Sequence, residues 1–140
     1  MEGHTFFVES VLWSLDGSYL FSGSSDRTIR KWDTDTGDTI GEPWRGHAKY
    51  VNSLAISPNG TRIASASYDN TIRFWDADSG SQVGEPLRRK GPLTFSPSGD
   101  FIASTGGDNT FSIWRVPWWD ETQKQVSRCA RCRDRNMMFG

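Results

Sequence analysis

The chain has 140 residues, of which 35% are hydrophobic and 24% are charged, a mixture that is typical of a globular domain. Its formal net charge of −1 argues against nucleic-acid and membrane partners, because no global field draws the chain to polyanions. Apolar runs fall far below the roughly 18 residues of a membrane span, and the N-terminus lacks the features of a secretory signal, so we expect a cytoplasmic or nuclear protein.

The sequence repeats itself along most of its length. Residues 3–45 can be laid over residues 46–88 with nearly half of the positions identical, and a shorter, degenerate copy follows at 89–119. Self-similarity at a period of about 40 residues is typical of stacked repeat units. We therefore expect three units within residues 1–119, followed by a tail, residues 120–140, that is disordered or forms a short helix.

Each unit is predicted to fold as a small antiparallel sheet, because apolar residues alternate with small or polar ones between turn signals. In the first unit Asp16-Gly17 marks a tight hairpin turn, and Asn59-Gly60 and Ser98-Gly99 stand at the matching places, where glycine supplies a positive φ. The second unit shows four expected strands: residues 51–56, 62–65, 71–75 and a shorter one at 82–84. Four strands in about 40 residues indicate one blade of a propeller.

The repeated motifs resemble those of the WD-repeat β-propeller family. They read Gly3-His4…Asp26…Trp32-Asp33, then Gly46-His47…Asp69…Trp75-Asp76, and a third copy ends in Asp108…Trp114-Arg115. The segment that links the first two units is similar, more narrowly, to large fungal WD-repeat proteins. The resemblance implies an all-β fold: a partial, open β-propeller of about three four-stranded antiparallel blades, the third degenerate, with a short C-terminal tail.

The resemblance also implies a hydrogen-bonded network that ties each blade together. Its members would be His4, Ser22, Asp26 and Trp32, then His47, Ser65, Asp69 and Trp75, and finally Ser104, Asp108 and Trp114. A neutral imidazole can donate to the carboxylate and accept from the hydroxyl, which in turn accepts the indole N–H. A hydrolase triad uses the same residue types, but their repetition at one spacing favours architecture, so we expect no catalytic residue.

The third unit departs from the pattern in two ways. It has lost its histidine, and its first strand is shortened and carries Pro92. Proline cannot donate to a strand ladder, so this blade is expected to be less well ordered.

Three blades are too few to close a ring, which needs about 170 residues at the smallest size. The two end faces would then be bare unless something covers them. A second copy could pair through the open blade edges to complete the ring, or a partner chain could supply the missing blades. A third alternative is an incomplete gene product that is poorly stable alone.

The resemblance places partner binding on the face around the central channel. The residues carried over to that face are Phe7, Glu9, Ser25, Tyr50, Asn52 and Tyr68. Aromatic side chains are enriched in interfaces, although Phe7 and Tyr50 could instead pack loops over the blades. We therefore expect a non-catalytic scaffold that binds a protein or peptide, with a self-assembling arc or a non-functional fragment as the alternative.

The tail holds a lone Cys129-x-x-Cys132 pair. A structural zinc site needs four ligands and no second pair exists, so no metal or cofactor is expected. An intermolecular metal site, a disulfide or redox activity stay open as alternatives.

Overall fold

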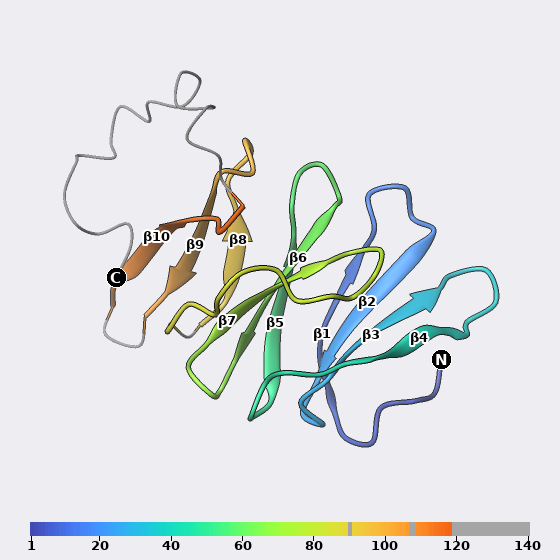
Figure 1. Cartoon of the computed structure of the whole chain (residues 1–140). Helices are drawn as coiled ribbons and strands as arrows, with labels where there is room; N and C mark the ends of the chain where they lie inside the picture. The colour runs from blue at the N-terminus through green and yellow to red at the C-terminus, as the bar shows by residue number, and fades with distance from the viewer. Residues whose placement is uncertain (90, 107–108, 119–140) are drawn as a thin grey trace.

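The structure is a computed structural model that describes residues 1–89, 91–106 and 109–118, so Asp108, Cys129, Cys132 and the predicted tail helix lie outside the described residues. Within these ranges, ten strands form three antiparallel sheets that follow one another in chain order (Figure 1). No helix in this part of the chain is long and apolar enough to cross a membrane. The expected all-β, open architecture is confirmed, because none of the three sheets closes on itself.

The first sheet is complete. Its strands lie in chain order: β1 (Val8–Trp13), β2 (Tyr19–Ser24), β3 (Ile29–Asp33) and β4 (Thr39–Trp44). The second sheet contains β5 (Val51–Ile56), β6 (Arg62–Ser67) and β7 (Ile72–Asp76), and the third contains β8 (Leu93–Phe95), β9 (Phe101–Thr105) and β10 (Phe111–Arg115). The hairpin turns are as predicted, with φ of 75° at Gly17 and at Gly60 and 78° at Gly99.

The expectation of four strands in every unit is wrong for the second sheet. Where a fourth strand was expected, two isolated bridges pair Trp75 with Gln82 and Ile72 with Leu87. Gly84, with a φ of 67°, and Pro86 lie between the two bridges, but Gly41, with a φ of 68°, and Pro43 stand at the matching places inside β4. The two units therefore differ in their fourth strands although they share this Gly-Glu-Pro segment.

The third sheet has the shortest first strand of the three among the described residues. Three strands are described there, and β8 has three residues where β1 and β5 have six each. Pro92 stands one residue before β8 rather than inside it, and its carbonyl accepts the Thr105 N–H at 3.4 Å. A shortened first strand was predicted and is confirmed.

Two hydrophobic layers lie between the sheets. The first joins Phe21, Ile29 and Trp44 of the first sheet to Val51, Leu54, Ile63 and Trp75 of the second. The second joins Ala64, Ala66, Ile72 and Phe74 of the second sheet to Ile102 and Trp114 of the third. Because successive side chains point to opposite faces of a strand, the second sheet contributes to both layers and is covered on both faces.

The joints between the sheets also have polar contacts. The hydroxyl of Ser10 on β1 accepts the Leu54 N–H of β5 at 3.2 Å, and the hydroxyl of Ser53 on β5 accepts the Leu93 N–H of β8 at 3.2 Å. Ser10 and Ser53 occupy matching positions in their units. The first strands of neighbouring units are therefore held together in the same way at both joints.

Candidate functional site

The side chains that the sequence grouped in the first unit lie together in the structure. His4 comes from the segment before β1, Ser22 from β2, Asp26 from the β2–β3 turn and Trp32 from β3. The His4 Nδ1–H donates to Asp26 Oδ2 at 2.7 Å, and Ser22 Oγ lies 2.7 Å from His4 Nε2. The Trp32 indole N–H donates to the same hydroxyl at 2.7 Å.

The second unit repeats this geometry. His47 Nδ1 lies 3.0 Å from Asp69 Oδ2, and its Nε2 lies 2.7 Å from Ser65 Oγ. The Trp75 indole N–H donates to Ser65 Oγ at 2.8 Å. In both units the serine is buried and its hydroxyl is hydrogen-bonded to both the histidine ring and the indole N–H.

Both aspartates are held ionised by the donors around them. Burial alone would raise the pKa of Asp26, but the Thr28 hydroxyl, His4 and the Thr5 N–H lower it to about 2. Burial likewise opposes ionisation of Asp69, whereas the Thr71 hydroxyl and the Ala48 N–H bring its pKa to about 2. A carboxylate that accepts several hydrogen bonds favours its charged form.

The pKa of His47 moves in the direction that keeps the ring neutral. Burial lowers it, and this outweighs the opposing attraction of Asp69. A neutral ring can donate from Nδ1 to the carboxylate while Nε2 accepts from Ser65, which is the arrangement that the distances support.

The third unit has no such network among its described residues. Ser104 and Trp114 are both buried, but the Trp114 indole N–H has no hydrogen-bond partner there. The guanidinium carbon of Arg89 lies 4.3 Å from the Trp114 ring centroid. In the other two units, a histidine ring contacts the matching tryptophan. Sequence reasoning missed this contact; its signal is that Arg89-Lys90 follows Arg88 where Gly46-His47 follows Arg45 in the second unit.

The predicted partner residues fall into two groups by exposure. The side chains of Phe7, Tyr50 and Tyr68 are 80%, 51% and 60% exposed. The two tyrosines form an edge-to-face pair with ring centroids 6.2 Å apart, and the Tyr68 N–H donates to the Tyr50 carbonyl at 3.0 Å. Ser25, by contrast, is buried and its hydroxyl donates to the Glu9 carboxylate, which leaves little of Ser25 for a partner.

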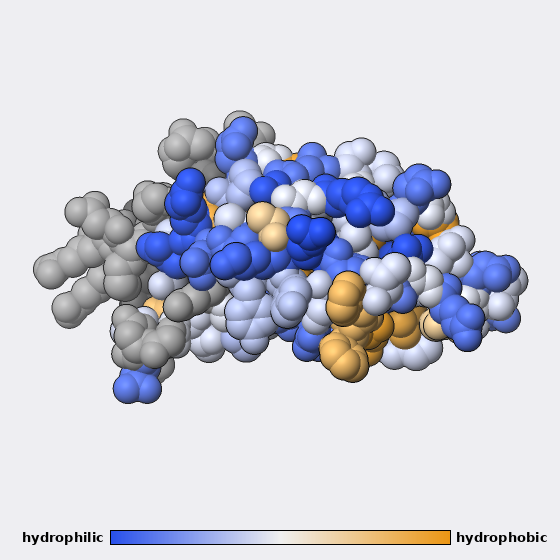
Figure 2. Space-filling model, turned by 90° about the horizontal axis from the view of Figure 1, so that it is seen from below, coloured by the Kyte–Doolittle hydropathy of each residue, from blue (hydrophilic) through white to orange (hydrophobic). Residues whose placement is uncertain are grey.

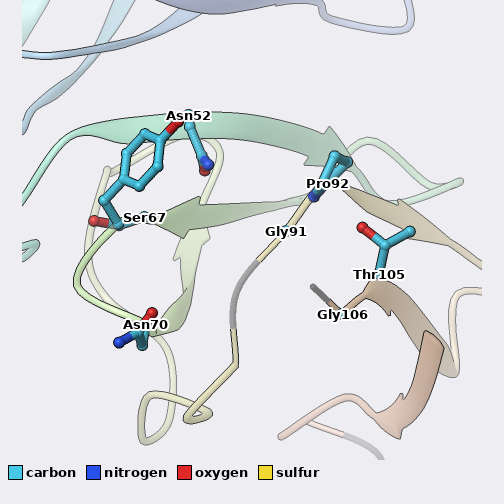
Figure 3. Close-up of a pocket in the computed structure, with 8 residues that line it drawn as sticks. Asn52, Ser67, Asn70, Gly91, Pro92, Thr105 and Gly106 are labelled. Carbon is cyan, nitrogen blue, oxygen red and sulfur yellow. The ribbon is translucent and has the colours of Figure 1, made fainter. Parts of the chain in front are cut away.

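A hollow of about 250 Å³ lies beside the tyrosine pair, where the second and third sheets meet (Figure 3). Asn52 of β5 lines it, and its buried amide oxygen has no hydrogen-bond partner among the described residues. Sequence reasoning selected Asn52 and Tyr68 but missed the other lining residues, which are Ser67, Asn70, Gly91, Pro92, Thr105 and Gly106. No group of three metal-ligating side chains occurs in the described part of the chain.

Parts of the chain are similar to known proteins. The family model described as "WD domain, G-beta repeat" matches residues 1–33, 38–76 and 93–115. The small ribosomal subunit protein RACK1 of Candida albicans is 50% identical over 38 residues, and that of Drosophila melanogaster is 49% identical over 37. These stretches are 27% and 26% of this chain and 12% of each relative, so the chain matches only a small part of either protein.

Solved structures extend the likeness to most of the chain. A structure of U3-55K has a TM-score of 0.76 at 25% identity, covering 82% of this chain and 38% of that one. The crystal structure of the RRP9 WD40 repeats has a TM-score of 0.75 at 26% identity, covering 82% and 37%. Because the family model matches well over half of its residues, the chain belongs to the WD40 repeat family.

Proposed function

We propose that this chain is a non-catalytic scaffold that binds a protein or peptide through the surface around Tyr50 and Tyr68. The observation that carries the proposal is the exposed edge-to-face tyrosine pair beside the hollow at the joint of the second and third sheets. Two adjacent aromatic rings offer a large contact area with few rotatable bonds, which suits an interface. Asn52 lines the same hollow and places a polar side chain beside the aromatic pair.

The network residues have a structural role in this proposal. His4, Ser22, Asp26 and Trp32, with their counterparts in the second unit, tie the segment before each sheet to its turn and its third strand. They thereby fix the ends of the strands beside which Phe7, Tyr50 and Tyr68 stand in the chain. The units are taken as residues 3–45, 46–88 and 89–119.

A cytoplasmic or nuclear location is part of the same proposal. Its support is the family match together with the relatives named as small ribosomal subunit proteins, which work inside the cell.

A peptide-display selection on the immobilised chain tests the binding surface. Peptides that enrich should bind Tyr68→Ala and Tyr50→Ala at least tenfold more weakly, because each variant removes one ring of the pair. Trp13→Ala is the matched control, since Trp13 is an aromatic residue of similar exposure on β1. Failure to enrich any peptide, or peptides that respond to Trp13→Ala instead, would contradict the proposed surface.

A further inference from the structure

One face of the first sheet is bare. Val8, Val11 and Trp13 of β1 are 51%, 58% and 59% exposed, whereas Leu12 between them packs into the layer shared with the second sheet. Figure 2 shows hydrophobic side chains gathered on the half of the molecule that holds the first sheet. A hollow of about 570 Å³ lies on the same face, lined by Val8, Val11, Leu20 and Trp32, among others.

The internal repeat shows what covers a face of this kind. Val8, Val11 and Leu20 match Val51, Leu54 and Ile63 of the second sheet, which are 0%, 8% and 0% exposed. Those three are covered by the opposite face of the preceding sheet, through Phe21, Ile29 and Trp44. The bare face is therefore shaped to receive the corresponding face of another sheet of this type.

The third sheet has a corresponding face that no other described sheet covers. Ala103 pairs with Ile113 and Thr105 with Phe111, so these four side chains share the face that points away from the second sheet. By sequence match, Phe111 occupies the place of Ile29 and Ile72, which are fully buried against the next sheet. Phe111 itself is 71% exposed.

We propose that two copies of this chain join head to tail, with the first sheet of each copy packed on the third sheet of the other. Such a joint pairs two different surfaces and forms a closed assembly when the rotation between copies permits. Three sheets from each copy make a ring of six, within the range of about four to eight blades that propellers use. This inference does not depend on binding at Tyr68.

The new joint differs from the internal joints in one respect. Pro92 stands where Ser10 and Ser53 stand in the other units, so it has no hydroxyl to bond the first strand of the next sheet. The joint would rest on apolar contact between Phe111 and Ile113 on one side and Val11, Trp13 and Leu20 on the other. Because apolar contacts are not screened by ions, the association should change little with salt.

Light scattering coupled to gel filtration tests the proposal on the purified chain. The expected mass is twice the 15.8 kDa of one chain, with little change between low and high salt. Val11→Glu and Phe111→Glu should each give the single-chain mass, because each buries an unpaired charge in the joint. Tyr68→Ala, which lies outside both faces, should leave the mass at twice that of one chain.

Mixing the two charged variants separates a head-to-tail joint from other pairings. Val11→Glu has an intact third sheet and Phe111→Glu an intact first sheet, so the mixture can form one sound joint and should recover the doubled mass. Both positions are exposed in the single chain, and an unchanged far-UV circular dichroism spectrum verifies that the variants fold.

Three outcomes would overturn the proposal. One is a wild-type chain that keeps the single-chain mass at every concentration tested. Another is a doubled mass that persists in either charged variant. If only Phe111→Glu stayed dimeric, the two copies would be pairing through their first sheets. The last is a mixture of folded charged variants that fails to recover the doubled mass.

Discussion

The first and second sheets carry matching residues in different surroundings. Val8 and Val51 occupy the same position in their units, yet Val8 is 51% exposed and Val51 is fully buried, because only the second sheet has a neighbour on that side. The His–Ser–Asp–Trp networks, in contrast, have nearly the same distances in both sheets, since all four members come from one unit. Contacts inside a unit follow from the unit itself, whereas burial of its faces depends on what stands next to it.

The largest expected effect tests whether matching faces are buried in the second sheet and exposed in the first. Ile63→Ala should lower the free energy of unfolding by about 3 kcal/mol, because it opens a cavity between two sheets. Leu20→Ala, at the matching position, should cost less than about 1 kcal/mol, since Leu20 lies on the bare face. Urea unfolding measures both, in a Phe111→Glu background so that association between copies does not cover Leu20. Equal costs would show that the first sheet is covered in solution.

The next effect tests the similarity of the two networks. Asp26→Ala and Asp69→Ala should each cost roughly 1–3 kcal/mol, because each leaves a histidine N–H and the neighbouring donors without their acceptor. The two costs should agree within a factor of about two, because the bonds lie within one unit. Urea midpoints of both variants provide the measurement. A much smaller cost in the first unit would mean that the bare face weakens the network.

A smaller effect extends the comparison to the third sheet. Trp75→Phe and Trp114→Phe remove the same atoms. Trp75 donates its indole N–H to Ser65 at 2.8 Å, whereas the Trp114 indole N–H has no partner among the residues that the structure describes. Trp75→Phe should therefore cost about 1 kcal/mol more than Trp114→Phe, the net value of one hydrogen bond. Thermal unfolding of the two variants tests this. An equal or greater loss for Trp114→Phe would show that its N–H has an acceptor after all.

The smallest expected effect is the change of folding stability with pH. Because the folded chain lowers the pKa of His47 below 6.5, the unfolded chain binds that proton more readily, so stability should decline as the pH falls below 6.5. Asp26 and Asp69 have pKa values of about 2 against an ordinary 3.8, so the stability they contribute is present above 3.8 and is lost as the pH falls through 2.

The thermal midpoint measured against pH checks both signs. In the double variant Asp26→Asn/Asp69→Asn, the thermal midpoint should depend less on pH between pH 3.8 and about 2, because the two carboxyl groups that titrate there are gone. A midpoint in the wild-type chain that stays constant from neutral pH down to that range would contradict the assignment.

Much of the fold could be predicted from local signals. The strand expected at 51–56 matches β5, and the three turn glycines have the positive φ that a hairpin demands. The spacing of His4, Asp26 and Trp32 was read from the repeat, and the structure places these side chains in one hydrogen-bonded chain through Ser22. Such signals succeed because alternation and turn chemistry act over a few residues.

The errors arose where distant segments meet. The interrupted fourth strand of the second sheet depends on how residues 82–87 pair with β7. Trp44 stacks on Trp75 of the next unit with ring centroids 5.9 Å apart, and Arg89 lies over Trp114, and neither contact has a local signature. The hollow beside Tyr68 has walls from two sheets, so no single strand indicates it.

The sequence by itself determined the repeat, the antiparallel sheets, the tight turns and the residue types of the networks, because each of these depends on residues within one unit. Only the tertiary structure decided which of two matching faces is buried, as for Val51 and Val8, and which indole N–H has an acceptor, as for Trp75 and Trp114. The physical reason is that burial and hydrogen-bond satisfaction are properties of the space between elements, and that space is filled by side chains from elsewhere in the chain.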